Sequence, residues 1–153
     1  DNQHAPSSII DFARLVFKLR RELAFCERDE FFTGAPQANS RLKDVTWLTE
    51  RGAELTHEDW HDSSRRVLGM MVHRPSGDPQ AAHATSLHGA TALLILNSSD
   101  QTTAFMLPFR EKSGTWAEIA NTSRMDQKGG AVYREVIDIL AHSGALLECR
   151  HDP

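Results

Sequence analysis

Residues 44–61 read DVTWLTERGAELTHEDWH, and this stretch separates two interpretations of the chain. Its last five residues, His57 to His61, match the H-E-x-x-H pattern of zinc proteases. The run Val45-Thr46-Trp47-Leu48 is β-branched and aromatic, and Glu50-Arg51-Gly52 follows it, so this part predicts a strand and a turn. The first interpretation makes the protein a hydrolase in its own right. The second makes the stretch a structural segment without catalysis.

A zinc site here would need His57 and His61 on one face of a helix, with Glu58 acting on a metal-bound water. A third ligand could come from one of three further histidines, His73, His83 or His88. The residues that follow the motif, 62–66, are acidic, hydroxyl-bearing and basic, which predicts a solvated turn instead of the long core helix of a zinc protease. We therefore expect no metal cofactor and regard these histidines as exposed side chains. A zinc hydrolase remains the remote alternative.

The composition is that of an ordinary soluble domain. The chain has 153 residues, of which 40% are hydrophobic and 25% are charged. A formal charge of −4 gives no bulk attraction to nucleic acid or to acidic membranes, and no apolar run approaches the roughly 20 residues of a membrane helix.

The spacing of Cys26 and Cys149 fits no zinc or redox motif, and two unpaired thiols are favoured over a disulfide. Together with the lack of a signal-peptide pattern, this predicts a cytoplasmic protein.

The N-terminal region predicts one long helix over residues 8–25. Ser8 can cap it, and four apolar residues recur at helical spacing, namely Phe12, Val16, Leu19 and Leu23. Additional apolar residues fill other faces of this helix, including Ile9, Ile10, Leu15 and Phe17. A helix this apolar needs a broad partner surface. On its own, the chain is expected to expose that surface and self-associate, or to fold it against its own strands.

Downstream, the pattern predicts many short strands separated by turns. The expected strands cover residues 45–48, 67–72, 90–96, 103–107, 116–120 and 145–149, with a long loop over 74–88. Residues 131–142 are ambiguous, because Tyr133, Val136, Ile137 and Leu140 recur at helical spacing although several neighbours are β-branched. One long helix followed by many strands predicts a mainly β protein, an antiparallel β-sandwich behind an N-terminal helix.

A collinear series of segments resembles the C-terminal part of bacterial glycogen debranching enzymes and isoamylases, in the α-amylase superfamily. The most specific segments are Asp44–Leu48, Gly52–Thr56 and Glu58–Trp60. The other matching segments, in family order, are residues 10–15 with 19–21, residues 31–34, residues 68–71, residues 93–97 and the strand ending at Leu107-Pro108. The resemblance weakens after Trp116, and it implies strands over residues 131–149.

The resemblance implies a division into two parts. Residues 1–30 would be the final helix of a (β/α)₈ barrel and a linker, and residues 31–153 would be the C-terminal β-sandwich domain. Family members hydrolyse α-1,6 branch linkages of glycogen with carboxylates of the barrel, which needs about 250 residues. No catalytic position of the family has a counterpart here, so we assign no catalytic residue. The chain is expected to be the non-catalytic domain that stabilises the barrel, its main partner.

A carbohydrate-binding module for α-glucans is the alternative from a different functional class. Its only support in the sequence is aromatic: three tryptophans could form stacking platforms for sugars. Trp47 and Trp116 lie in strand patterns and are expected in or beside the core. Trp60 is the one candidate carbohydrate-binding residue. The chain contains no nucleophile elbow and no phosphate-binding glycine loop.

Overall fold

The computed structural model describes residues 9–23, 31–36, 43–73, 91–108, 114–125 and 130–151. Within these ranges the elements are α1 (Ile9–Leu23), β1 (Val45–Leu48), α2 (His57–His61), β2 (Val67–His73), β3 (Thr91–Asn97), β4 (Thr103–Met106), β5 (Gly114–Asn121), η2 (Thr122–Arg124), β6 (Val132–Tyr133), β7 (Val136–Ile139) and β8 (Ser143–His151). The expected cap at Ser8, the thiol of Cys26 and the expected loop over 74–88 lie outside the described residues.

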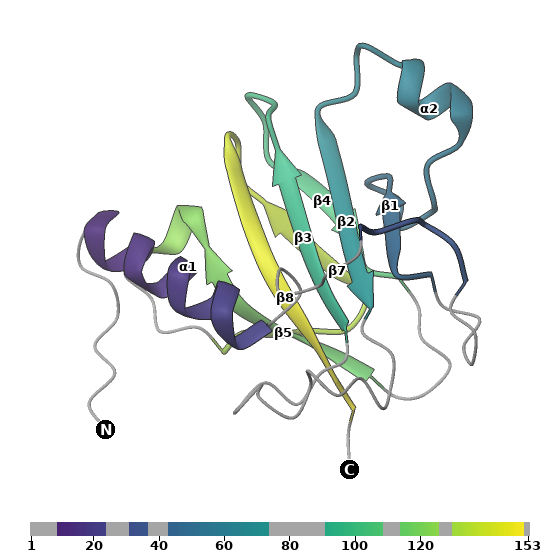
Figure 1. The fold of residues 1–153 in the computed structure, drawn as a ribbon. Coiled ribbons are helices and arrows are strands. Elements are labelled where there is room, and N and C mark those ends of the chain that lie inside the picture. The colour runs from purple at the N-terminus through teal and green to yellow at the C-terminus, as the bar shows by residue number, and fades with distance from the viewer. Residues whose placement is uncertain are drawn as a thin grey trace.

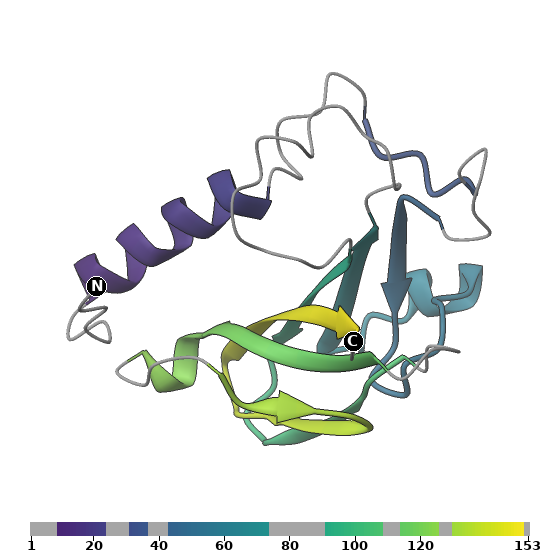
Figure 2. The ribbon, with the colours of Figure 1, turned by 90° about the horizontal axis from the view of Figure 1, so that it is seen from below.

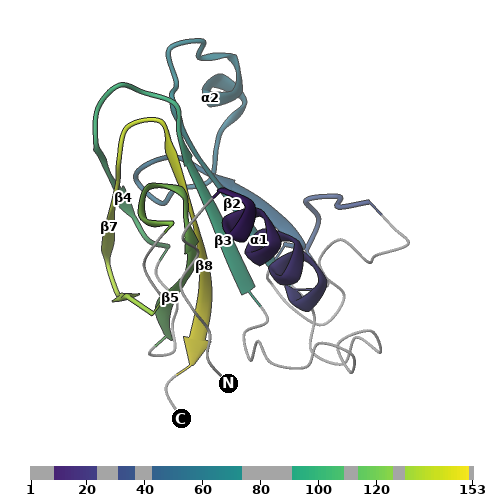
Figure 3. The same ribbon diagram turned by 90° about the vertical axis from the view of Figure 1, so that its left-hand side faces the viewer.

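The strands form two antiparallel sheets. One has six strands in the order β1-β2-β3-β8-β5-β6, and the other consists of β4 and β7 (Figure 1). The view from the side shows β4 and β7 on one face of the large sheet and α1 on the opposite face (Figure 3). The mainly β fold, a sandwich with one long N-terminal helix, is therefore confirmed.

The hydrophobic core lies between the two sheets. Strands alternate their side chains between two faces, so every second residue of β3 and β8 points inward. The inner face of the large sheet meets the inner residues of β4 and β7 in one cluster, which comprises Leu48, Val67, Leu93, Ile95, Phe105, Leu107, Trp116, Ile137, Ile139, Ala145, Leu147 and Cys149. Trp116 is 1% exposed, as expected for a core residue, and Cys149 is a buried free thiol.

A glycine in β2 lets the small sheet approach the large one. Gly69 lies beside Leu48 in the β1–β2 register, and a Cβ built on it would lie 2.6 Å from the Phe105 ring and 3.2 Å from Leu48 Cβ. Phe105 itself is fully buried. The glycine that interrupts an otherwise apolar strand in the sequence thus marks the place where an aromatic ring rests on the backbone.

Residues 131–142 contain two short strands, β6 and β7, and the helix favoured by their periodicity is wrong. β6 pairs with β5, and β7 pairs with β4 with Phe105 opposite Ile137. Along β7, exposed Val136 and Asp138 alternate with buried Ile137 and Ile139. The apparent helical spacing arose because Tyr133 and Leu140 belong to other elements, so their distance from β7 in sequence carries no information about a shared face.

The helix α1 contacts the outer face of the large sheet through a narrow stripe. Leu19 is buried and Leu15 half-buried, and they pack against Ala92 and Leu146 in a small second cluster. Of the apolar residues expected at helical spacing, Leu19 is buried and Phe12 half-buried, whereas Val16 is 44% exposed. Seen from below, α1 and β7 lie on opposite sides of β5 and β8 (Figure 2). None of the helices in the described ranges is long and apolar enough to cross a membrane.

One buried carboxylate fixes the segment at residues 31–36 beside β1. Asp44 is 4% exposed and accepts hydrogen bonds from the backbone N–H groups of Thr33, Gly34 and Val45 at 2.7–2.9 Å. Burial by itself raises the pKa of Asp44, but these donors and the Thr33 hydroxyl outweigh it, so the pKa lies below the usual 3.8. The Asp44 carboxylate is therefore charged in the folded protein at neutral pH.

Replacing Gly69 by alanine should destabilise the protein by about 1–3 kcal/mol, because the new methyl group cannot fit beneath the Phe105 ring without shifting it. Urea unfolding measures the difference. In a Phe105→Leu background, where the smaller side chain leaves room, the same glycine substitution should cost clearly less. An equal cost in both backgrounds would mean that the ring does not impose the constraint.

The substitution Asp44→Asn should lower the free energy of unfolding at neutral pH by about 1–3 kcal/mol, since an amide is a weaker acceptor for these donors. The folded pKa is lowered, so the wild type has this stabilisation above the unfolded value of 3.8 and loses it as the pH falls through the folded value. The difference in free energy of unfolding between the wild type and Asp44→Asn should therefore become smaller towards about pH 3. Unfolding curves at several pH values test this, and a gap that widens on acidification contradicts it.

Candidate functional site

The helix α2 carries the segment with the zinc-protease pattern, and local hydrogen bonds explain why it forms. Thr56 is its N-cap: its hydroxyl accepts from the Asp59 N–H at 3.2 Å. The Asp59 carboxylate in turn accepts from the Thr56 N–H at 2.8 Å, which completes a capping box. These bonds, with the Thr56 backbone bond as the largest cause, hold the pKa of Asp59 below its usual value. A helix of five residues is marginal without such caps.

An arginine attaches α2 to the end of β1. Arg65 Nη1 donates to Glu50 Oε2 at 3.0 Å, and its Nη2 forms a short ion pair with Asp59 Oδ1. The arginine side chain is 18% exposed, so the pair is screened less than a surface pair. Asp59 thus serves both the cap and this ion pair, which leaves Trp60 in a fixed position.

Trp60 lies on α2 and is 53% exposed. It contacts Trp47 of β1 edge to face, with ring centroids 5.5 Å apart and an interplanar angle of 76°. Trp47 is only half-buried and lies on the outer face of the large sheet, opposite Met70 of β2. The two rings therefore form an aromatic step at one end of that face, which could stack on the apolar side of a sugar ring.

His57 and His61 lie one turn apart on α2, as the pattern requires, but no residue of this helix is buried. Their rings are 4.5 Å apart, and the Nδ1 of His61 contacts the backbone carbonyl oxygen of His57 at 2.8 Å. Of the three candidate third ligands, His73 lies on β2, where its Nδ1 contacts the Thr91 hydroxyl at 2.8 Å. His83 and His88 lie outside the described residues. Within the ranges that are described, no three potential ligands form a metal-binding group.

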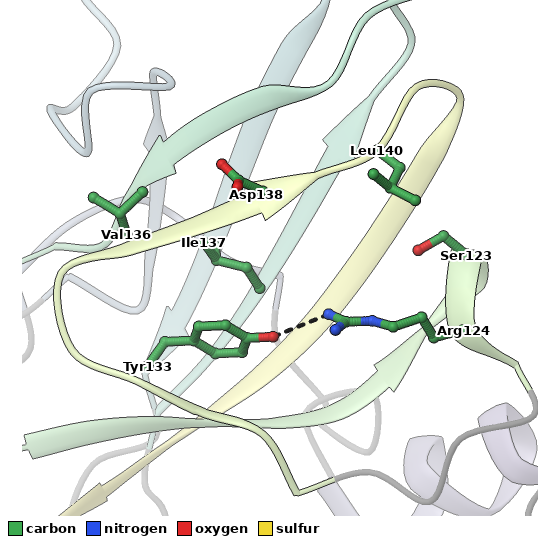
Figure 4. A pocket seen from close by; sticks show the side chains of 7 residues that line it. All are labelled: Ser123, Arg124, Tyr133, Val136, Ile137, Asp138 and Leu140. Atoms are coloured by element: carbon green, nitrogen blue, oxygen red, sulfur yellow. Dashed lines mark hydrogen bonds between the residues drawn. The ribbon is translucent and has the colours of Figure 1, made fainter.

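A pocket of about 360 Å³ lies at the open corner of the sandwich, between β7 and the end of β5. It is lined by Ser123, Arg124, Tyr133, Val136, Ile137, Asp138 and Leu140 (Figure 4). The close view shows Tyr133 and Arg124 on one side and β7 on the other, with the Ile137 side chain reaching between them. None of these residues is predicted to be functional from the sequence, because they come from separate short elements with no motif between them.

A buried carboxylate organises the polar wall of this pocket. Glu118 of β5 is 6% exposed. Its Oε2 accepts from Arg124 Nη2 at 2.6 Å and from the Asn121 side-chain amide at 3.0 Å. The same Arg124 nitrogen donates to the Tyr133 hydroxyl oxygen at 2.9 Å, and this bond, ahead of the nearby Glu118 charge, raises the pKa of Arg124. The guanidinium is therefore charged, held in place and electrically balanced.

Comparison with known proteins gives a partial answer on ancestry. No family model matches the chain. The chain is 26% identical over 118 residues to a protein named Glycogen operon protein GlgX homolog from Mycobacterium bovis, and equally to the proteins of that name from two strains of Mycobacterium tuberculosis. The alignment covers 76% of this chain but 16% of each relative, so the chain spans about a sixth of their length. This similarity supports a distant relationship to the GlgX homologs of glycogen operons.

Proposed function

We propose that the chain is the C-terminal, non-catalytic domain of a glycogen debranching hydrolase, and that it packs against and stabilises the catalytic barrel. In this proposal residues 1–30 complete the barrel and residues 31–153 form the sandwich domain. The similarity to much longer GlgX homologs supports it, as does the family resemblance of the segment from Asp44 to Trp60. The hydrolysis of α-1,6 branches then takes place on the barrel, in the cytoplasm.

The two apolar sides of α1 are the observation that carries this proposal. Leu15 and Leu19 contact the sheet, whereas Phe17 lies two residues further than Leu15 and so about 200° around the helix. Ile10 lies about 20° from Phe17 around the helix, and the two residues are 60% and 64% exposed. Ile9, which is 67% exposed, lies on the flank between the two sides. A helix with two apolar sides is suited to lie between two bodies, here the sandwich and the barrel.

Burial of the second side should contribute substantially to stability in the full-length protein. Removing one large side chain such as Phe17 from water is worth about 1.5–3 kcal/mol. The helix would then be part of the interface, and the sandwich would cover the end of the barrel where that helix closes it. Self-association of the separate chain, expected from the sequence, would use the same residues.

The substitution Phe17→Asp in the full-length product of the gene should lower the midpoint of heat inactivation by several degrees and leave the rate of α-1,6 hydrolysis at 25 °C nearly unchanged. The reason is that a charge enters an apolar interface remote from the catalytic residues. The assay follows the reducing ends released from glycogen. Met106→Asp is the matched control, because Met106 is equally apolar and 52% exposed but lies on β4, away from α1. Equal effects of both substitutions, or a gene product without a hydrolase domain, would contradict the proposal.

Binding of α-glucans through Trp60 is the second candidate function. It is favoured by the half-exposed ring that Trp47 and the Arg65 ion pair hold in place. Stacking on a sugar would cover the Trp60 ring and change its fluorescence.

Maltoheptaose should change the tryptophan fluorescence of the chain at millimolar concentration, and Trp60→Ala should abolish the change. Trp116 is buried, and the response should survive Trp116→Phe provided the protein stays folded. If saturating sugar does not change the tryptophan fluorescence of the wild type, glucan binding through Trp60 is excluded. The proposed structural role of the domain is not affected by that result.

A further inference from the structure

The outer edge of β7 carries backbone groups that no strand of the described chain uses. β7 is the last strand on its side of the small sheet. The Leu107 N–H donates to the Glu135 carbonyl at 2.7 Å, so these two residues are a hydrogen-bonded pair between β4 and β7. In an antiparallel ladder hydrogen-bonded pairs alternate with non-bonded pairs, so every second pair along β7 from Glu135 is hydrogen-bonded to β4. Val136 and Asp138 fall between these pairs and direct their N–H and C=O groups to the outer edge. The Met106 N–H, opposite Val136, correspondingly points away from β7, to the Glu50 carbonyl.

This edge forms one wall of the corner pocket (Figure 4), so its outward-directed N–H and C=O groups can serve as donors and acceptors there. On the facing wall, Arg124 uses only Nη2 in its bonds to Glu118 and Tyr133, and a guanidinium has five N–H donors, so further donors remain. The Ser123 hydroxyl donates to Asn121 Oδ1 at 2.7 Å, which leaves its oxygen able to accept. Ile137 and Leu140 add apolar surface between these groups.

The charge balance of the pocket decides which kind of ligand fits. The Arg124 charge is compensated by Glu118 at 2.6 Å, so an anion would gain little there and would have to displace or share that partner. A neutral ligand whose groups donate and accept at the same position matches the mixed walls, and hydroxyl groups do both. The C–H faces of a sugar ring suit the apolar floor. The volume of about 360 Å³ also falls within the range of small-ligand pockets, about 300–1,000 Å³.

We propose that this corner pocket, between β7 and the wall formed by Ser123, Arg124 and Tyr133, binds the end of a neutral oligosaccharide. The assignment of that oligosaccharide as an α-glucan rests on the proposed function. Hydroxyls of one or two sugar units bond the free N–H and C=O groups of Val136 and Asp138 and the free N–H groups of Arg124. Glu118 does not touch the sugar and acts as a positioning residue that holds the guanidinium. The site is separate from Trp60, which lies on α2.

Titration of the ¹⁵N-labelled 153-residue chain with maltohexaose tests this by two-dimensional NMR. The expected result is a saturable shift of the backbone amides of Val136 and Asp138 and of the Arg124 side chain, with Trp60 unaffected at the concentrations that saturate these signals. Ser123→Leu, which fills the pocket from an exposed position, and Tyr133→Phe, which removes the hydroxyl partner of Arg124, should each weaken binding at least about fivefold. Both variants should keep the remaining spectrum of the folded protein.

Trp60→Ala is the control and should bind maltohexaose at the pocket as the wild type does. The proposal is overturned if maltohexaose shifts no pocket signal at millimolar concentration. If cellohexaose, with β-1,4 linkages, shifts the same signals as strongly, the assignment of the ligand as an α-glucan is overturned. It is also overturned if a short β-prone peptide, acetyl-Thr-Val-Thr-Val-amide, binds the β7 edge and the sugar does not, because the edge would then be a strand-pairing site. A full-length enzyme that is sensitive to Phe17→Asp but shows none of these sugar shifts contradicts only this proposal.

Discussion

The contact between the Phe105 ring and the backbone at Gly69 sets the position of the small sheet over the large one. Because the ring lies where any other residue would place a Cβ, β4 lies closer to β2 at this point than a larger residue at position 69 would allow without a shift. β7 is then placed by its register with β4, and Ile137 and Ile139 complete the core. A two-stranded sheet can cover only part of a six-stranded one, so the position of this contact also determines which parts of the large sheet stay uncovered.

Two regions beside the large sheet are left uncovered by the elements of the described ranges, and they differ in chemistry. At the corner beyond β7, the short strand β6 does not close the sandwich, and the polar cluster of Glu118, Arg124 and Tyr133 occupies the gap. On the opposite face of the large sheet, α1 covers only the area near Ala92 and Leu146. The first region is suited to a small ligand with hydroxyl groups, and the second to a large apolar partner. The two proposed roles, assembly and ligand binding, therefore use different faces of the domain.

The sequence predicts local structure well where one residue pattern determines it. The strands at residues 45–48 and 67–72, and the apolar run before Asn97, were all located correctly because alternation and turn residues are local signals. The pairing order was not accessible, since β8 inserts between β3 and β5 across a long separation in sequence. The pocket was inaccessible for the same reason: Arg124 and Tyr133 meet only through the β5–β6 pairing. At residues 131–142 periodicity was wrong and family resemblance was right, because resemblance carries information about long-range pairing.

Local structural contacts account for several residues of the segment His-Glu-Asp-Trp-His. Asp59 is needed twice, as the reciprocal partner of Thr56 in the capping box and as the partner of Arg65. Trp60 packs on Trp47, and His61 bonds the turn that precedes it through the His57 carbonyl. The side chains of His57 and Glu58 take part in none of these contacts. Three of the five residues, Asp59, Trp60 and His61, therefore have structural tasks that account for their presence without a catalytic role.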